Sequence, residues 1–299
     1  MMRFLALPGM ALLMLALSGC SGLLFYPAPG IVRTPADVGL DYRDLALQAA
    51  DGTRLNAWWL PAQGEARGTV LFLHGNAENI STHLASVYWL PAAGYQVLLL
   101  DYRGFGRSEG VPEIPAVFAD IRAALAWIQS ENSAQGLPLY LLGQSLGASL
   151  GGWLVGAEPA VRSAFHGVVL DAGFARYDWI AREVAARSWL TWPLQWPLGW
   201  SMPDRFDLVD VVGAISPVPV LLIHGTRDQI VGYQHAQALF DAAREPRFLL
   251  SYEGPHIGSF QDEQIRQAVV RFFADSVHNN GTAASREHHE AAERWQAGW

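Results

Sequence analysis

The chain has little cysteine, little charge and no basic cluster. One cysteine in 299 residues excludes an intrachain disulfide, and 16% charged residues beside 51% hydrophobic ones exclude a largely disordered chain. A formal net charge of −8 without a block of basic residues argues against a nucleic acid as partner. No spacing of residues typical of a metal site is evident, so we expect no metal and no other cofactor. No protein partner is predicted.

The first 19 residues have the composition of an export signal. Arg3 supplies a positive charge, residues 4–17 are almost all apolar, and small residues precede Cys20. The apolar stretch is shorter than the roughly 20 residues of a membrane-spanning helix. The segment from Leu17 to Cys20 resembles the lipobox of bacterial lipoproteins, whose cysteine is acylated and becomes the first mature residue. The resemblance implies a signal peptide over 1–19 and a lipid anchor on Cys20; an ordinary cleaved signal is the alternative.

The residue after this cysteine, Ser21, bears on the location of the protein. In lipoproteins of double-membrane bacteria, a serine at this place, rather than an aspartate, usually accompanies sorting to the outer membrane. We therefore expect a lipoprotein of the bacterial cell envelope, held on the outer membrane and facing the periplasm.

After a tether and entry segment over 20–43, strand-like and helix-like segments alternate. Apolar runs, several of them closed by glycine, predict strands at 44–49, 54–60, 69–73, 95–100, 139–142, 167–170, 218–223 and 248–252. Apolar residues at spacings of three and four predict helices at 116–129, 146–155, 233–243 and 261–273. Asp51-Gly52 between the first two strands predicts a hairpin. The alternation predicts an α/β fold with a mostly parallel central sheet flanked by helices.

Two regions depart from this alternation, and the domain is expected to span 44–278. Residues 176–213 form an insert without an evident strand, and its prolines prevent a long helix. The insert contains five tryptophans: Trp179, Trp189, Trp192, Trp196 and Trp200. Residues 279–299 are polar and are expected to form a loosely ordered tail.

Residues 143–147 read Gly-Gln-Ser-Leu-Gly and stand directly between a predicted strand and a predicted helix. A serine at such a tight turn needs glycine on both sides, because the strand and the helix then approach closely. Its hydroxyl is exposed above the sheet, and the amide of Leu146 at the helix start faces the same space. The pattern is similar to the nucleophile elbow of the α/β-hydrolase family, and this resemblance implies that Ser145 is a nucleophile.

A serine nucleophile requires an imidazole to accept its proton and a carboxylate to orient that imidazole. In the family that this chain resembles, the acid and then the histidine follow the serine along the chain. His256, in the loop after the last predicted strand, lies where the family carries its base. Asp228, after the penultimate strand, matches the usual acid. Asp171 is its rival, because it also ends a strand and some members take their acid from there.

The loop after the strand at 69–73 is expected to complete the site. In the family, the residue after a His-Gly pair donates its backbone N–H to the developing oxyanion, which here implies Asn76 as one donor and Leu146 as the second. His74 precedes the serine in the chain and is expected to support this loop rather than to act as a base.

The motifs at 73–79 and 100–110 resemble the Bem46-like and ABHD13-like branch of the α/β-hydrolases. The resemblance implies a serine hydrolase that cleaves acyl esters or thioesters of small or lipid-like substrates through an acyl-enzyme, with the insert as a cap. Five aromatic residues in a cap predict an apolar acyl pocket, unless they only dock the cap onto the body. A serine peptidase of the related aminopeptidase type and a non-catalytic surface protein on the same scaffold are the alternatives.

Overall fold

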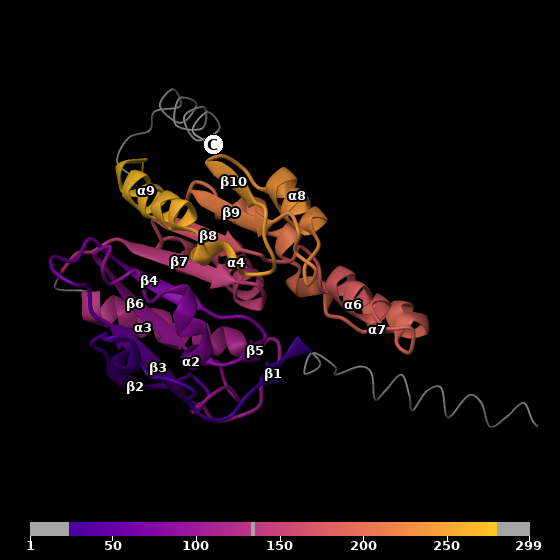
Figure 1. The fold of residues 1–299 in the computed structure, drawn as a ribbon, viewed down its shortest axis with the longest axis horizontal. Coiled ribbons are helices and arrows are strands. Elements are labelled where there is room, and N and C mark those ends of the chain that lie inside the picture. Colours follow the sequence, from indigo (N-terminus) through magenta and orange to yellow (C-terminus); the bar gives the residue numbers. More distant parts are fainter. Residues whose placement is uncertain (1–23, 133–134, 280–299) are drawn as a thin grey trace, which may run out of the picture.

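The part of the chain that the computed structural model describes, residues 24–132 and 135–279, is built around an eight-stranded sheet (Figure 1). Its strands are β2 (Arg43–Gln48), β3 (Arg54–Leu60), β4 (Gly68–Leu73), β6 (Tyr95–Leu100), β7 (Leu139–Gln144), β8 (Gly167–Asp171), β9 (Val220–Gly225) and β10 (Arg247–Tyr252). They lie in the order β10-β9-β8-β7-β4-β6-β3-β2. The pairs β2–β3 and β3–β6 are antiparallel and the others parallel, which confirms the predicted mostly parallel sheet.

Helices connect the parallel strands, as the alternating pattern predicts. They are α2 (Ile80–His83), α3 (Val117–Asn132), α4 (Leu146–Ala157), α5 (Pro159–Arg162), α6 (Tyr177–Ala186), α7 (Gln195–Trp200), α8 (Tyr233–Ala242) and α9 (Glu263–Asn279). Short 3-10 helices add single turns at 35–38, 84–86, 192–194, 204–206, 208–210, 212–215 and 259–261. The last helix ends six residues beyond the expected Phe273, because the buried Ser276 continues its inward face.

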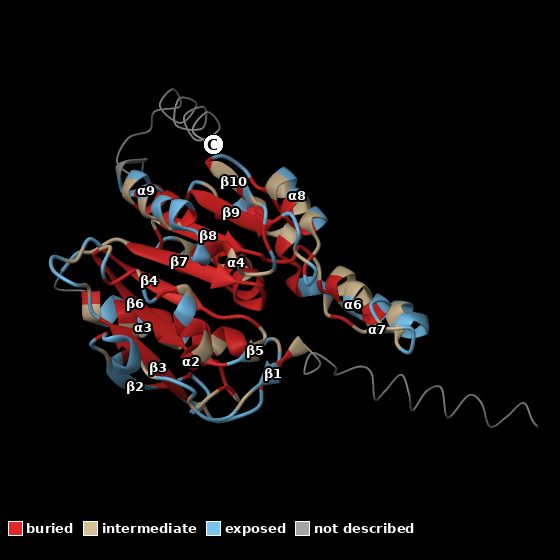
Figure 2. Cartoon of the chain, in the orientation of Figure 1, coloured by how far each residue is buried: buried red, intermediate tan, exposed pale blue. Residues whose placement is uncertain are grey.

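Successive residues of the central strands face two separate cores. In β4, Leu71 and Leu73 pack in the core that contains residues of α3, α4 and α8, whereas Val70 and Phe72 pack in the core that contains residues of α9. All six residues of β4, β6 and β7 are buried, and Figure 2 shows the middle of the sheet as a buried layer. Burial on both faces explains why these strands are continuous apolar runs.

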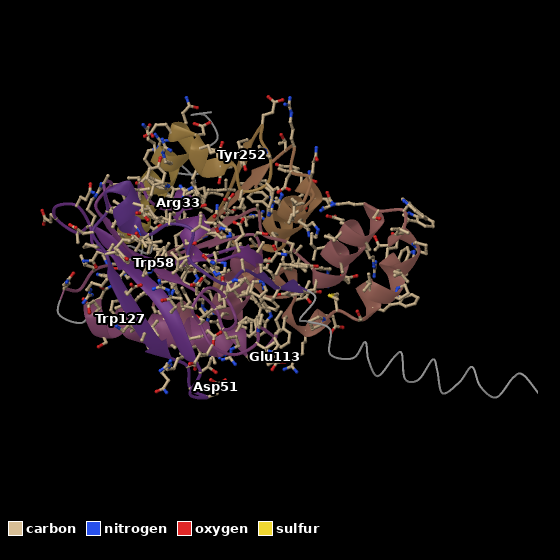
Figure 3. All side chains as sticks on the ribbon, turned by 60° about the horizontal axis from the view of Figure 1, so that its bottom comes forward. Arg33, Asp51, Trp58, Glu113, Trp127 and Tyr252 are labelled. Carbon is tan, nitrogen blue, oxygen red and sulfur yellow. The ribbon has the colours of Figure 1, made fainter. Side chains whose placement is uncertain are left out.

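The insert at 176–213 contains α6 and α7, and no strand occurs within it. These two helices pack against each other and project from the body in Figures 1 and 3. In Figure 3, Asp51 in the β2–β3 turn and Tyr252 at the end of β10 mark the two edges of the sheet. The helix pair extends outward between those edges.

The interval expected as a tether, 20–43, is attached to the body from Leu24 onward. A short strand β1 (Tyr26–Pro27) pairs in parallel with β5 (Ala77–Glu78). Phe25 is buried and packs edge-on against Phe105, with ring centroids 6.2 Å apart. A two-residue strand has no periodicity, so no sequence pattern indicates it.

Several predictions fall on residues outside the described part of the chain. These are the signal peptide at 1–19, the lipid on Cys20 and nearly all of the tail at 279–299, of which only Asn279 is described, as the last residue of α9. They stay predictions. Within the described ranges, every helix is too short or too polar to cross a bilayer.

Candidate active site

The turn between β7 and α4 holds Ser145 in a conformation that is uncommon for residues other than glycine. Its φ is 52° and its ψ is −116°. A Cβ atom on Gly147 would lie 2.1 Å from the carbonyl oxygen of Leu73, and one on Gly143 would lie 2.6 Å from the Cα of Ala148. Both glycines are therefore required by the close approach of the helix to the strands, which is the reason given by the sequence pattern.

The structure brings Ser145, His256 and Asp228 together. The distance between His256 Nε2 and Ser145 Oγ is 3.0 Å, and that between His256 Nδ1 and Asp228 Oδ2 is 2.6 Å. The three residues follow β7, β10 and β9, respectively, and these parallel strands end at the same edge of the sheet. The topology thus converts a separation of 111 residues between the serine and the histidine into a hydrogen bond.

Asp228 is held as a carboxylate. Burial raises its pKa, but the hydrogen bond and the electrostatic attraction of the His256 ring, together with two backbone N–H groups, outweigh burial and bring the pKa below its ordinary value of 3.8. The N–H groups of Ile230 and Val231 donate to Oδ1 at 2.7 and 2.9 Å. An ionised carboxylate only accepts hydrogen bonds, so Nδ1 of His256 donates, which leaves Nε2 free to accept the proton of Ser145.

The rival acid, Asp171, lies beside the turn and not at the imidazole. Its fully buried Oδ2 accepts hydrogen bonds from Gln144 Nε2 at 2.8 Å and from Ser259 Oγ at 2.6 Å. Its backbone oxygen accepts from the N–H of Ser145 at 2.8 Å. Burial raises the pKa of Asp171 to about 6, against the opposing hydrogen bonds from Ser259 and Gln144. The geometry therefore favours Asp228 over Asp171 as the partner of His256.

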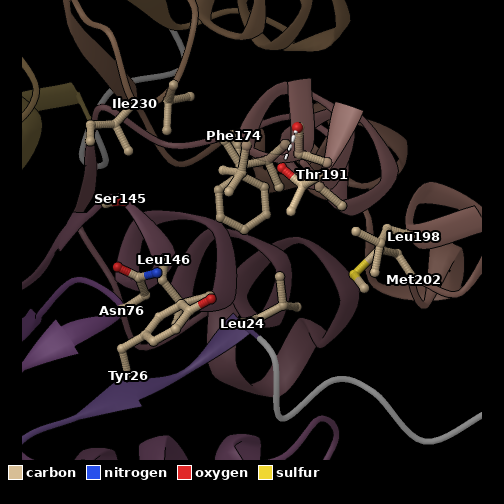
Figure 4. Close-up of a pocket in the computed structure, with 15 residues that line it drawn as sticks. Leu24, Tyr26, Asn76, Ser145, Leu146, Phe174, Thr191, Leu198, Met202 and Ile230 are labelled. Carbon is tan, nitrogen blue, oxygen red and sulfur yellow. Dashed lines mark hydrogen bonds between the residues drawn. The ribbon is translucent and has the colours of Figure 1, made fainter. Parts of the chain in front are cut away.

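The two expected oxyanion donors, Asn76 and Leu146, line the same pocket as Ser145 (Figure 4). Leu146 is the first residue of α4, so its N–H has no acceptor within that helix. The carbonyl of Asn76 accepts a hydrogen bond from the N–H of Tyr26 at 2.7 Å. This bond holds the Asn76 loop against β1, a contact that no sequence signal predicted.

Two buried histidines support that loop. His74 is fully buried, its Nδ1 lies 2.8 Å from the carbonyl oxygen of Gly75, and its ring contacts Tyr102 at 4.6 Å between centroids. The Nε2 of His83 lies 3.1 Å from the carbonyl oxygen of Ala77. Burial lowers the pKa of both imidazoles, which keeps them uncharged at neutral pH. His74 thus makes its contacts within the supporting structure of the loop.

A cavity of about 340 Å³ opens at Ser145 (Figure 4). None of its 15 lining residues carries a charge. Leu24 and Tyr26 contribute from the N-terminal segment, and Leu198 and Met202 contribute from the cap. The site is therefore an apolar pocket beside a polar hydrogen-bonded relay, the arrangement expected for a small-molecule site. Among the described residues, no cluster of three or more possible metal ligands occurs.

The tryptophans of the insert do not line this pocket, so the prediction of an aromatic acyl pocket was wrong. The cap instead presents aliphatic side chains of α6, Ile180, Ala181 and Val184, which share one helix face. Trp179 contacts His235, with ring centroids 5.5 Å apart. The other four tryptophans are each more than half exposed, so they do not serve mainly to dock the cap either.

Comparisons with known proteins show what the chain is similar to. The family described as "Serine aminopeptidase, S33" matches residues 64–206. The uncharacterized protein YfhR of Escherichia coli (strain K12) is 32% identical over 237 residues, which cover 77% of this chain and 79% of that protein. The alpha/beta hydrolase domain-containing protein WAV2 of Arabidopsis thaliana is 31% identical over 245 residues, which cover 75% of this chain and 76% of that protein.

Solved structures extend the likeness to the fold. The Pyrococcus furiosus esterase Pf2001 superposes with a TM-score of 0.69 at 20% identity, covering 84% of this chain and 97% of that chain. Membership of the Bem46-like and ABHD13-like branch stays a prediction. The sheet order, the strand–serine–helix turn and the identity to WAV2 over three quarters of both proteins lead to one conclusion: the chain belongs to the α/β-hydrolase superfamily.

Proposed function

We propose that the protein is a serine hydrolase that cleaves acyl esters or thioesters. In this proposal Ser145 is the nucleophile, His256 the general base and Asp228 the acid that orients the imidazole. The observation that carries the proposal is the pair of hydrogen bonds, 3.0 and 2.6 Å long, that joins these three side chains beside an uncharged pocket.

The reaction proceeds in two acyl transfers. Ser145 Oγ attacks the acyl carbon while His256 Nε2 takes the hydroxyl proton. The negative oxygen of the tetrahedral intermediate then accepts hydrogen bonds from the backbone N–H groups of Asn76 and Leu146. Collapse breaks the bond to the leaving alcohol or thiol, which takes the proton from His256. Water then attacks the acyl-enzyme in the same way and releases the acid. Each amide contributes about 3 kcal/mol to transition-state stabilisation.

The substrate proposed is an ester or thioester with a short-to-medium acyl group. A volume of about 340 Å³ lies near the lower end of the roughly 300–1,000 Å³ of ligand pockets, and uncharged walls suit a hydrocarbon chain. A panel of p-nitrophenyl esters from acetate to palmitate measures the preference. Absence of turnover at every chain length would remove the proposal.

Fluorophosphonate labelling tests the nucleophile directly. We expect one covalent adduct, on the peptide that contains Ser145, and its loss in Ser145→Ala. Ser163→Ala, at an exposed serine, is the matched control and should label normally. His256→Ala should label far more slowly, because no base then removes the hydroxyl proton. Labelling that persists in Ser145→Ala would refute the assignment, and a chain that never labels would instead fit a non-catalytic surface protein.

The family description favours a second candidate, a serine aminopeptidase. Such an enzyme must bind a free amino group, for which an acidic side chain at the pocket is the usual partner. The residues that line this pocket include none. We therefore expect ester turnover without turnover of aminoacyl p-nitroanilides, and the opposite preference would favour the peptidase.

The proposal includes a lipid on Cys20 that tethers the enzyme to a membrane of the cell envelope, the outer membrane being the expected one. The lipobox-like sequence from Leu17 to Cys20 supports it. Native protein is expected in the detergent phase of a two-phase partition and Cys20→Ser in the aqueous phase, after removal of residues 1–19 in both. Retention of the mature Cys20→Ser protein in detergent would show that another feature holds it.

A further inference from the structure

The outer end of the cap is an exposed apolar surface, with one guanidinium, that of Arg182, lying 4.7 Å from the centre of the Trp196 ring. No charged residue occurs between Arg187 and Asp204. Six large apolar side chains in this interval are at least half exposed: Trp189, Leu190, Trp192, Leu194, Trp196 and Trp200. We call these six residues the cap tip. Figure 2 shows this end of the α6–α7 pair as mostly exposed.

A cluster of this kind is unusual on a protein surface in contact only with water. Single exposed apolar residues are common, but several large exposed apolar side chains in one short segment mark a surface that contacts something else. The cap tip lies at the end of a projecting unit rather than in a groove, so it can enter another phase while the body stays outside (Figures 1 and 3). Tryptophan beside leucine is the composition of segments that lie at a bilayer interface.

The position of the first described residues indicates that the cap lies near a membrane. Leu24 and Tyr26 line the same pocket as the cap residues Leu198 and Met202, so the N-terminal segment reaches the cap side of the molecule. Leu24 follows Cys20 by four residues, which span at most about 14 Å when extended. A lipid on Cys20 therefore holds the pocket mouth and the cap close to the membrane surface.

We propose that the cap tip inserts into the interface of the lipid bilayer that carries the protein, and so turns the pocket toward acyl esters dissolved in that bilayer. This inference rests on the proposed lipid tether and on the proposed hydrolase activity for its consequence, but the docking itself is measured without turnover. It assigns to Trp189, Trp192 and Trp200 a role that neither the pocket nor the core gives them, whereas Trp196 also packs on Arg182 of α6.

Site-specific labels test the docking. The lipidated protein is reconstituted in phosphatidylcholine–phosphatidylglycerol vesicles with an environment-sensitive maleimide dye in Leu190→Cys, and in Gln63→Cys as matched control. Gln63 is exposed in the loop that precedes β4, so it lies where the parallel strands begin, whereas Ser145 lies where they end. The native chain must take no dye, because its only thiol is acylated; uptake of dye would refute the tether rather than the docking.

The expected result is that phospholipids with nitroxide-labelled acyl chains quench the dye in Leu190→Cys at least about threefold more than in Gln63→Cys, because only the cap tip reaches the interface. Equal quenching at the two positions overturns the proposal. Protection of Leu190→Cys from aqueous iodide without quenching by the labelled lipids also overturns it, and would indicate that a second copy of the chain covers the cap tip.

A second arm separates docking from catalysis. Trp189→Ser/Trp192→Ser changes residues that do not line the pocket, so turnover of a water-soluble p-nitrophenyl ester should equal that of the native enzyme. Turnover of a p-nitrophenyl ester with a longer acyl chain, which partitions into the vesicles, should fall about tenfold. Val32→Ser/Val111→Ser removes two exposed apolar side chains outside the cap and should change neither rate. If the tryptophan variant turns over the ester in vesicles as fast as the native enzyme does, the proposal is overturned. If the native enzyme does not turn over the water-soluble ester, the proposed function is refuted. The quenching experiment then still decides whether the cap tip docks.

Discussion

Replacing Asp171 by asparagine is expected to stabilise the protein at neutral pH while leaving catalysis intact. The folded protein holds the proton of this buried carboxyl with a pKa of about 6, against an ordinary value of 3.8. An acid with a raised pKa in the folded state binds its proton more tightly there than in the unfolded chain, so folding stability falls as the pH rises from 3.8 to 6. The difference corresponds to about 3 kcal/mol above pH 6.

The hydrogen bonds around Asp171 are suited to an amide. Its Oδ2 accepts from Gln144 and Ser259, and the Oδ1 of asparagine can accept from both. Two buried oxygens in this cluster, Asp171 Oδ1 and Gln144 Oε1, have no hydrogen-bond partner in the described structure. The NH₂ group of asparagine can donate to the amide oxygen of Gln144. The substitution thus removes a buried charge and supplies a missing donor.

Thermal or urea unfolding of Asp171→Asn and native protein at pH 4, 5, 7 and 8 measures the effect. The variant should gain up to about 3 kcal/mol at pH 7 and 8, and the gain should shrink toward zero at pH 4, because both residues are then neutral. Turnover of p-nitrophenyl acetate should persist in Asp171→Asn and fall about 10,000-fold in Asp228→Asn. A stability difference that does not depend on pH, or loss of turnover in Asp171→Asn alone, would refute the reasoning.

Two further predictions concern packing and charge. Gly147→Ala should lower the free energy of unfolding, measured in urea, by more than about 3 kcal/mol, because the added Cβ meets the backbone of Leu73. Gly136→Ala, with φ of +61° and open space around the added Cβ, should lower it by about 1 kcal/mol. Equal losses would contradict the packing argument. Asp120→Ala should lower the free energy of unfolding by about 3–5 kcal/mol, because it leaves Arg103 with a poorly compensated buried charge. Arg54→Ala, which removes one partner of an exposed ion pair, should lower it by less than about 1 kcal/mol.

Most of the scaffold could be predicted from sequence because its signals are local. Strands buried on both faces are apolar runs, and the steric demand of the Ser145 turn is recorded as two glycines, Gly143 and Gly147. The placement of His256 and Asp228 at that turn came from a family resemblance, since no local pattern links residues 28 or 111 positions apart.

Features that depend on tertiary contacts were missed or wrong. The two-residue strand β1 exists only because the loop at Asn76 offers it a hydrogen-bonding partner. The sequence left open whether the tryptophans line an acyl pocket or dock the cap, and four of them do neither, because composition does not tell which side of a short, proline-interrupted helix faces the body. In α6 the face with Ile180 and Val184 is directed to the pocket, and the aromatic residues of the following segment are directed outward.

The pairing of β1 with β5 makes the two ends of the tether unequal. On one side a lipid on Cys20 would be pulled by every undulation of the membrane; on the other, the main-chain bond from Tyr26 to Asn76 ends at the loop that holds a proposed oxyanion donor. In the proposed tethered protein, a pull on this segment would therefore act first on the loop that holds Asn76. In the proposed tethered protein, a protease cut after Pro27 would separate Leu24 and Tyr26, which line the pocket, from the rest of the chain.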